Sequence, residues 1–443
     1  MQRSASYNEG DLGSPRCVYR EMAALASSMI TRVAYGVAQL PRLVWYLGHG
    51  LALRRLAEAA RRSSGTRAHR RVHTHAPVPD RSRLYSDMGK LFWQDLANVE
   101  AGIYPLPADH DGSLLTLINR SRLFFADLPE IHRRRERRAH SEIFNNATRG
   151  TRPRYYLQNF HFQSGGWLTD ESAARYDTQV EVLLNGTANA MRRQALPQLH
   201  ELFAGRDQRQ LRLLDIGCGT GRFLDFVKQA WPRLHVIGLD LSDAYIRYAK
   251  RLLRQRSRTS FVVSKAEAIP LPDASQDAVT SIFLFHELPP KVRRGALREC
   301  ARVLKPGGRL ILLDSLQRND LPDYEGLLQL FPQNYHEPFY VSYTKEDFRA
   351  LASQYGLTLV RSVMAFVSKV MVFDKGPAHD LRAGSRSALP QRERFAVTKR
   401  RPQGSADNVI SMGLVKSSIQ ESIWDWRTAP GRSRSLTPRG SRR

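Results

Sequence analysis

Three glycines at alternate positions, Gly217, Gly219 and Gly221, directly follow an apolar run that ends at Asp215-Ile216. The run has the length and aliphatic content of a buried strand, and apolar residues return at helical spacing after Gly221. The glycines therefore occupy a turn between a strand and a helix. Because glycine has no Cβ, such a turn reaches positive φ and lets a ligand approach the main chain closely. Its spacing differs from the G-x-G-x-x-G of dinucleotide-binding turns, so the elements that follow must identify the ligand.

An acidic residue stands at the end of the next apolar segment. Residues 234–241 are predicted to form a second strand, and Asp240 lies within the roughly 20-residue distance at which nucleotide-binding α/β folds place a ribose-binding carboxylate. On its own, an Asp at a strand end is more often a turn residue or helix cap, roles for which Ser242 and Asp243 are available. Its position after the glycine turn favours ribose binding, because one carboxylate accepts from both hydroxyls.

Strand and helix patterns continue to about residue 375. Apolar runs predict strands at 260–264, 277–285, 309–313, 358–364 and 366–373. Pro289 is expected to open the helix after the fourth strand, since proline is favoured at a first helical position. The helix that follows leads into the turn Leu304-Lys-Pro-Gly-Gly308 before the fifth strand.

Residues 205–375 resemble the class I S-adenosylmethionine (SAM) dependent methyltransferases, and most closely the methyltransferase type 11 subgroup that contains quinone-biosynthesis C-methyltransferases. The resemblance rests on the Asp215-Ile-Gly-x-Gly-x-Gly motif, Asp240, the segment 266–272 and the Leu-Lys-Pro-Gly-Gly turn. It implies an α/β fold: a Rossmann-like, seven-stranded, mostly parallel sheet with an antiparallel edge strand, plus an N-terminal helical cap. It also implies SAM as the cofactor and a methyltransferase activity.

The resemblance further implies which residues contact the cofactor. These are Asp215, Gly217, Gly219, Gly221, Asp240, Leu241, Ala266, Glu267 and Phe283. One position departs from the subgroup, which usually carries at Lys265 an Asp that accepts from the adenine amino group. A lysine ammonium can only donate, so that contact is either lost or made by another group, such as Glu267 or a backbone carbonyl.

The expected chemistry is an in-line displacement at an electrophilic methyl group, for which the protein supplies positioning and, where needed, a base. By family analogy the residues after the fourth strand face the reaction centre, and His286 is the best candidate base because its ordinary pKa lies near neutrality. The alternative, that His286 only shapes the pocket, stays open. Glu287, His161 and His336 are lesser candidates.

Aromatic segments flank the glycine motif and predict the acceptor site. Candidate substrate-binding residues are Tyr156, Tyr176, His336 and Tyr340, and the alternative for the upstream aromatics is the core of a helical cap. No metal site is expected. The histidines between residues 63 and 83 lack a Cys, Asp or Glu that would complete a ligand set.

The 443-residue chain is long enough for two or three domains and has a net charge of +26. Its basic excess concentrates in the flanks, and this permits association with nucleic acid or an anionic membrane without establishing either. The three cysteines match no metal or disulfide spacing, which favours reduced thiols and a cytoplasmic location. We expect the following segments: a flexible N-terminus at 1–20, an amphipathic helical segment at 21–62, a basic linker at 63–83, a helical cap at 84–204, the methyltransferase domain at 205–375 and a disordered basic tail at 376–443.

Apolar residues recur at helical spacing from residue 22 to residue 60, among them Ile30, Val33 and Val37. Charged residues interrupt the pattern, so no stretch reaches the ~18–20 apolar residues that a membrane span requires. The segment therefore either packs on the rest of the protein or lies on a membrane surface.

Three functional interpretations compete. The first is a methyltransferase that acts on a small-molecule or lipid-like acceptor, which the aromatic segments favour. The second is a methyltransferase for RNA or protein, suggested by the charge but not favoured, because the fourth strand lacks the Asn/Asp-Pro-Pro-Tyr motif of nucleic-acid amino-methylating enzymes. The third is a non-catalytic SAM-binding scaffold. The intact glycines and Asp240 argue against a dead cofactor site.

Overall fold

The computed structural model describes residues 15–63, 74–109 and 111–377 of the chain. The side chains of residues 15–27, 54 and 57–63 are outside this description. The predicted disordered tail lies almost wholly outside the described residues, as do residues 64–73 of the predicted linker and residues 1–14 of the predicted flexible N-terminus. The last residues of that N-terminus, from residue 15 on, belong to helix α1 (Pro15–Ser63). This helix begins with a proline, a residue that is favoured at a first helical position.

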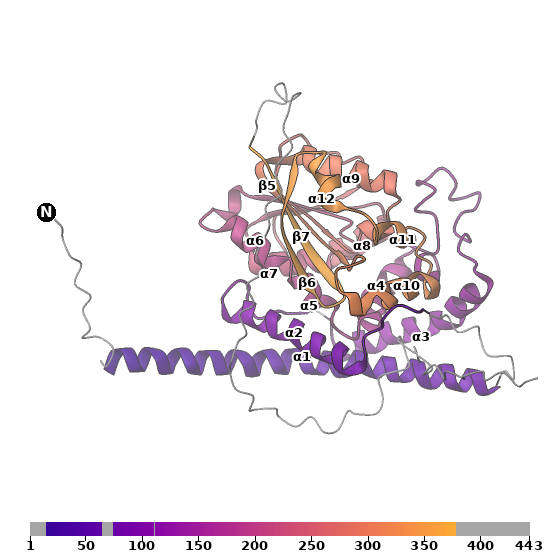
Figure 1. Ribbon diagram of the computed structural model, residues 1–443, viewed down its shortest axis with the longest axis horizontal. Coiled ribbons are helices and arrows are strands. Elements are labelled where there is room, and N and C mark those ends of the chain that lie inside the picture. Colours follow the sequence, from indigo (N-terminus) through magenta and orange to yellow (C-terminus); the bar gives the residue numbers. More distant parts are fainter. Residues whose placement is uncertain (1–14, 64–73, 110, 378–443) are drawn as a thin grey trace, which may run out of the picture.

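A single seven-stranded sheet with the order β3-β2-β1-β4-β5-β7-β6 forms the centre of the molecule (Figure 1). Its strands are β1 (Arg212–Ile216), β2 (His235–Asp240), β3 (Thr259–Val263), β4 (Gln276–Ile282), β5 (Leu304–Ser315), β6 (Leu357–Ala365) and β7 (Ser368–Lys375). Strands β3, β2, β1, β4 and β5 pair in parallel, whereas β7 runs antiparallel to both β5 and β6. The predicted Rossmann-like, mostly parallel sheet is confirmed, and its antiparallel strand β7 lies between β5 and β6.

Helices cover both faces of the sheet. The longer ones are α2 (Arg81–Glu100), α3 (Leu114–Arg137), α4 (Asp170–Leu183), α7 (Arg222–Ala230), α8 (Asp243–Leu252), α9 (Pro290–Val303) and α10 (Glu325–Asn334). The short ones are α5 (Ala188–Arg193), α6 (Leu196–Phe203), α11 (Tyr340–Tyr343) and α12 (Phe348–Ser353). Pro290 opens α9, one residue after the predicted proline, and Pro289 is its N-cap residue. Helices α6, α7 and α8 share one buried apolar cluster with the sheet, and α9 and α12 share the other.

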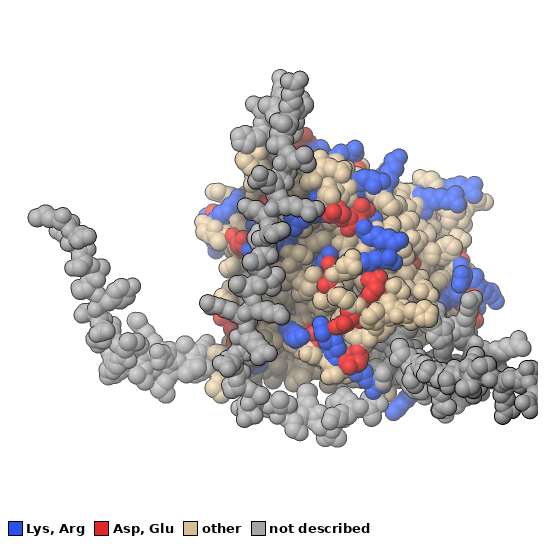
Figure 2. All heavy atoms as spheres, in the orientation of Figure 1, with Lys and Arg blue, Asp and Glu red and all other residues tan. Residues whose placement is uncertain are grey.

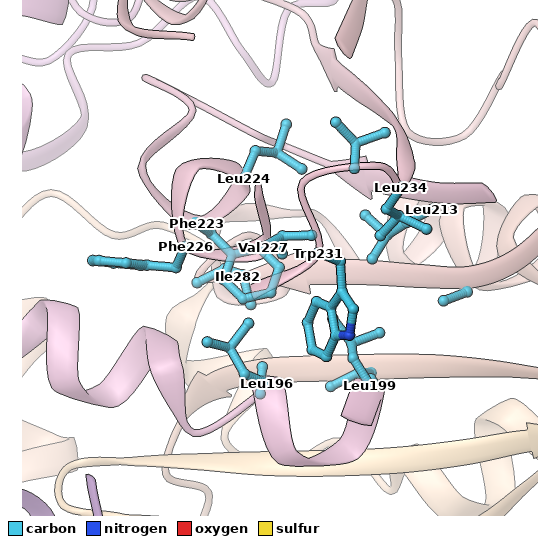
Figure 3. Close-up of a cluster of buried hydrophobic side chains, with 14 of the residues drawn as sticks. Leu196, Leu199, Leu213, Phe223, Leu224, Phe226, Val227, Trp231, Leu234 and Ile282 are labelled. Atoms are coloured by element: carbon cyan, nitrogen blue, oxygen red, sulfur yellow. The ribbon is translucent and has the colours of Figure 1, made fainter. Parts of the chain in front are cut away.

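The first of these clusters is drawn in Figure 3, where side chains of α6 and α7 converge on the sheet. Leu196 and Leu199 come from α6, and Phe223 and Phe226 come from α7. All four are at most 3% exposed. Burial of apolar side chains stabilises this layer by about 25 cal/mol for each Å² of apolar surface removed from water. The layer fixes α7, and therefore the glycine turn from which α7 begins.

The N-terminal helices form a cap whose members are joined to one another by buried ion pairs. Arg193 of α5 is 1% exposed and donates to Asp95 of α2 (2.6 Å) and to Asp109 (2.8 Å). Arg42 of α1 donates to Glu181 of α4 at 2.9 Å. Because an unpaired buried charge is strongly destabilising, these pairs fix the packing of the cap helices against one another.

The surface that the structure describes carries both signs of charge. In Figure 2, Lys and Arg side chains alternate with Asp and Glu over the face that is drawn. Among the described residues, no helix is long and apolar enough to cross a membrane.

Candidate functional site

The glycine turn after β1 has the backbone conformation that the sequence predicts. Gly217, Gly219 and Gly221 have φ values of 67°, 53° and 80°, a region that disfavours side chains with a Cβ. A Cβ added at Gly219 would meet no atom within 4 Å, so this position borders open space. A Cβ at Gly221 would instead lie 2.9 Å from the Leu253 side chain and 3.1 Å from Cβ of Ala249. Gly219 therefore leaves room for a ligand, whereas Gly221 allows α7 to pack against α8.

Asp240 lies at the carboxyl end of β2 and is aligned by main-chain groups. The Gly219 N–H and the Ser242 N–H each donate to its carboxylate at 2.9 Å. Burial raises the pKa of Asp240, while the backbone hydrogen bonds of Ser242 and Gly219 oppose that rise. The carboxylate is thus tied to the glycine turn, with lone pairs left over for a further donor.

A cavity of about 680 Å³, here called the cofactor cavity, opens beside these two elements. It is lined by Tyr155, Tyr156, Trp167, Tyr176, Gly217, Gly219, Leu239, Asp240, Leu241, Tyr245, Ser264, Lys265, Ala266, Ile282, Phe283, Leu284, Glu287 and Leu288. The indole N–H of Trp167 is buried and finds no acceptor in the described part of the chain. The cavity therefore offers an unused buried donor, a carboxylate and a glycine cradle, which fits a nucleoside that bears a carboxylate.

Most of the predicted cofactor residues line this cavity, and three do not. Gly217, Gly219, Asp240, Leu241, Ala266 and Phe283 lie in its wall. Gly221 lies behind the turn, for the packing reason given above. Asp215 is 1% exposed and accepts from Thr280 Oγ1 at 2.7 Å, so it faces the sheet interior. We assign Asp215 and Gly221 to the support of the turn rather than to direct contact with the ligand.

Glu267 also lies outside the cavity wall. Its two carboxylate oxygens accept from the Tyr155 hydroxyl at 2.9 and 3.1 Å. This engagement leaves Glu267 poorly placed to replace the adenine-binding Asp that is absent at Lys265. Lys265 itself lines the cavity together with Ser264, so the remaining acceptors for an adenine amino group on that side are the Ser264 hydroxyl oxygen and main-chain carbonyls.

Three aromatic rings form one wall of the cofactor cavity. Trp167, Tyr176 and Tyr245 meet edge to face, with centroid distances of 5.4 to 5.7 Å. Tyr245 is fixed by Ser172 of α4, whose hydroxyl oxygen lies 2.9 Å from the Tyr245 hydroxyl oxygen. Aromatic ring faces attract cations, so this wall suits a positively charged ligand centre. Tyr176 was predicted from the sequence, whereas Trp167 and Tyr245 were not assigned to the site.

A second cavity of about 860 Å³, here called the apolar chamber, adjoins the first. Its wall consists of His161, Tyr176, Val180, Leu183, Leu184, Met191, Phe283, His286, Glu287, Ser315, Leu316, Tyr324, Leu327, Leu328, Phe331, Tyr340 and Val367. Tyr176, Phe283 and Glu287 belong to both walls. The two cavities therefore meet at these three side chains, and the predicted residues Tyr176 and Tyr340 border the chamber.

The candidate base His286 lies in the chamber wall, in the 3-10 turn Phe285–Glu287. Strand β4 ends at Ile282, earlier than predicted, because Phe283 adopts a positive φ of 57° and the chain turns. His286 Nδ1 lies 2.6 Å from Asp314 Oδ1. Burial lowers the pKa of His286, but the nearby carboxylates of Asp314, Glu337 and Glu287 outweigh it and raise the pKa to about 9. At neutral pH this imidazole is a proton donor.

His336 does not border either cavity. Its ring lies tilted against that of His140 at a centroid distance of 4.1 Å, and its Nε2 lies 2.9 Å from Gln158 Oε1. The prediction of His336 as a substrate-binding residue is therefore corrected, because these contacts turn the ring away from both cavities. The neighbouring Glu337, which the sequence did not single out, turns toward His161 instead, with 2.9 Å between His161 Nε2 and Glu337 Oε1.

Comparison with known proteins agrees with this geometry. A family model described as "Methyltransferase domain" matches residues 213–308. The chain is 31% identical over 183 residues to the demethylmenaquinone methyltransferase of Thermotoga maritima, a match that covers 41% of this chain and 75% of that protein. It is 37% identical over 145 residues to the ubiquinone/menaquinone biosynthesis C-methyltransferase of Methylobacterium nodulans, covering 32% and 55%. It is 30% identical over 142 residues to the fatty-acid O-methyltransferase of Mycolicibacterium smegmatis, covering 32% and 50%.

The position of Asp215 predicts a pH-dependent stability. Burial, opposed by the Thr280 hydrogen bond, raises its pKa from 3.8 to about 7. Between these pH values the folded protein binds more protons than the unfolded chain, so the free energy of unfolding falls as the pH rises. At 1.36 kcal/mol per pKa unit, this decrease in the free energy of unfolding is on the order of 4 kcal/mol. We expect Asp215→Asn to show a much smaller decrease. Urea unfolding of the ligand-free protein from pH 4 to pH 8 measures it.

The matched control is Asp273→Asn, which changes a carboxylate whose side chain is 78% exposed. That variant should follow the wild-type pH dependence. Parallel curves for Asp215→Asn and the wild type would contradict the assignment of Asp215 as a buried carboxyl group.

Proposed function

Because the chain belongs to the class I SAM-dependent methyltransferases, we propose that it transfers the methyl group of SAM to a small apolar or lipid-like acceptor. The observation that carries this proposal is the wall that the cofactor cavity shares with the apolar chamber. A methyl group can pass only between reactants that touch, and the shared wall is where the contents of the two cavities meet.

On the cofactor side, the donor and acceptor groups of the cavity suit the parts of SAM. Asp240 is the acceptor for the ribose hydroxyls, and the open main chain at Gly219 leaves room for the ligand. The buried Trp167 indole N–H is a donor suited to the amino-acid carboxylate. When bound, SAM supplies a sulfonium that makes its methyl group electrophilic.

The protein's part in the transfer is to orient the reactants and to exclude water. The rings of Trp167, Tyr176 and Tyr245 suit the sulfonium charge, since desolvated cation–π contacts contribute about 2 kcal/mol. Tyr176 and Phe283 line both cavities. In-line displacement requires that sulfur, methyl carbon and acceptor atom be collinear, and rigid packing of the Tyr176 and Phe283 rings supports that alignment.

On the acceptor side, the chamber is mostly apolar, with leucines from α10 and aromatic rings from the segment before β6. His286 and Glu287 are its polar groups near the shared wall. An acceptor with an apolar body and one polar reactive end fits this distribution. The names of the relatives, which refer to a menaquinone precursor and a fatty acid, support the same class. His286, held by Asp314, serves in this proposal as the donor that orients the polar end.

The two alternatives are less well supported. An RNA substrate would favour a basic surface, whereas acidic and basic side chains are interspersed on the face drawn in Figure 2. A non-catalytic scaffold would have no need of a second cavity that meets the cofactor cavity at Tyr176, Phe283 and Glu287.

Replacing the ribose acceptor tests the cofactor site. Asp240→Ala removes a charged hydrogen-bond acceptor, a loss of about 1.5–3 kcal/mol, so the Kd for SAM should rise roughly 10- to 100-fold. Isothermal titration calorimetry with SAM, and separately with NAD, measures this, and NAD should not bind. The control is Asp243→Ala, an Asp at the start of α8 whose side chain is 54% exposed. Unchanged SAM affinity in Asp240→Ala would contradict the ribose assignment.

Filling the chamber separates acceptor binding from cofactor binding. Leu328 lines the chamber but not the cofactor cavity, so Leu328→Trp should occupy acceptor volume and leave the SAM Kd unchanged. We expect kcat/KM to fall by roughly tenfold or more, or about 1.4 kcal/mol. The measurement is transfer of labelled methyl groups from SAM to a panel of phenols, quinols and fatty acids. Labelling of RNA or protein alone would contradict a small-molecule acceptor.

We also propose that α1 lies on an anionic membrane surface. Its outer face carries a stripe of apolar side chains, Met29, Ile30, Val33, Val37 and Val44, each 67–69% exposed. Its inner face is buried through Tyr35, Gln39 and Tyr46. Arginines outnumber acidic residues in the sequence of the helix, and two of them, Arg32 and Arg42, pair with Glu100 and Glu181 of neighbouring helices. Exposed apolar surface next to positive charge is the pattern of interfacial helices. A membrane would also be the source of a lipid-like acceptor.

Val37→Asp tests this surface. Placing a charge in the stripe should reduce binding to vesicles of phosphatidylglycerol and phosphatidylcholine by roughly tenfold, or about 1.4 kcal/mol. Co-sedimentation at low and high salt measures it, and binding should weaken as salt rises. The control is Val341→Asp on α11, which is 46% exposed. Concentration-dependent dimers that Val37→Asp abolishes, without vesicle binding, would assign the stripe to a second copy and contradict the proposal.

A further inference from the structure

Three side chains with metal-ligand chemistry converge beside the apolar chamber. His161 comes from the 3-10 turn Phe160–Phe162, Glu287 from the turn after β4, and Glu337 from the segment between α10 and α11. One donor atom from each lies within 4.8 Å of those of the other two. His161 and Glu287 both line the chamber, and Glu287 lines the cofactor cavity as well.

Glu337 is the unusual member of this group. It is 3% exposed, and neither carboxylate oxygen accepts a hydrogen bond from any residue that the structure describes. His161 Nε2 lies 2.9 Å from Oε1, but the contact lacks hydrogen-bond geometry. Buried carboxylates are normally paired with a cation or satisfied by several donors. Both oxygens of Glu337 are therefore free to bind a ligand next to His161 and Glu287.

The charge balance also calls for a cation at this position. Within the described chain, neither Glu287 nor Glu337 forms an ion pair with a lysine or arginine; their ion-pair contacts are His286 at 4.0 Å and His161 at 2.9 Å. Two carboxylates held close together in a mostly apolar wall repel each other strongly. A positive ion between them would offset this repulsion.

From this geometry we infer that His161, Glu287 and Glu337 bind a divalent transition-metal cation of the Mn²⁺ to Zn²⁺ series. One imidazole and two carboxylates suit these borderline ions. Mg²⁺ and Ca²⁺ are less suited, because they prefer all-oxygen ligand sets. The three ligands are far apart in the chain and form no spaced motif, so the sequence alone gives no sign of this metal site.

Three protein ligands leave at least one coordination position of a four-coordinate ion unfilled by protein. That position takes a hydroxyl or carboxylate oxygen of the acceptor, so the preferred acceptors are oxygen-bearing molecules with an apolar body. This assignment of the open position rests on the proposed function, whereas the metal site itself does not.

The experiment is a titration of the chelator-treated full-length protein with Mn²⁺, followed by electron paramagnetic resonance, and with Zn²⁺, followed by calorimetry, both without SAM. We expect one ion per chain, with an affinity that falls roughly tenfold or more in Glu337→Gln and in His161→Ala. The control is Glu130→Gln on α3, which changes an exposed carboxylate and should bind the metal as the wild type does.

Thermal unfolding of each variant establishes that it is folded. If the wild-type protein bound no metal up to millimolar concentration, the inference would be overturned. The two glutamates would then share a proton instead of a metal ion. Binding that Glu337→Gln and His161→Ala both retain would overturn it as well. SAM titration of the same samples separates the two proposals: metal binding without SAM binding counts against the proposed function alone, and SAM binding without metal binding counts against this site alone.

Discussion

The buried carboxylate of Asp177 joins the helical cap to the glycine turn, and both cavities depend on that junction. Asp177 lies in α4 and accepts from Thr220 Oγ1 at 2.8 Å and from Arg222 Nη2 at 3.0 Å. Burial would raise its pKa, but Arg222 and Arg192 lower it below the ordinary value, so the group is ionised. Truncating one partner of such a buried pair typically costs about 3–5 kcal/mol. The preceding residue, Tyr176, is thereby held between the cavities.

The cap is specified by charge geometry to an unusual degree. Arg193 bridges Asp95 and Asp109, and Asp95 also accepts from Tyr104 at 2.8 Å. Replacing buried ion pairs by apolar residues is often neutral or stabilising, so hydrophobic packing alone could have joined these helices. What the ion pairs add is directionality, since each guanidinium matches its carboxylates in one orientation only. One fixed orientation of the cap keeps Tyr176 and Trp167 in the wall of the cofactor cavity.

Local patterns in the sequence were sufficient for the sheet and for the glycine turn, because strand periodicity and positive φ are properties of neighbouring residues. The same patterns identified Asp240, which the Gly219 N–H aligns. They failed where side-chain direction depends on distant partners. Asp215 turns to Thr280, Glu267 to Tyr155, and His336 to Gln158. Glu337 could not be singled out from the sequence. Only the fold shows that its carboxylate lies beside His161 and accepts no hydrogen bond from the described residues.

The end of β4 accounts for the difference in character between the two cavities. Phe283 has a φ of 57°, a conformation that costs a non-glycine residue about 1–3 kcal/mol. Its N–H nevertheless keeps a ladder-type bond to the Leu313 carbonyl at 2.8 Å, so the strain is held in place by the sheet. This turn puts the Phe283 ring in both walls and directs His286 and Glu287 toward the chamber. A regular continuation of β4 would alternate side chains across the sheet, which would put His286 on the face opposite to Phe283 and Glu287. The turn at Phe283 instead places Phe283, His286 and Glu287 together in the wall of the apolar chamber.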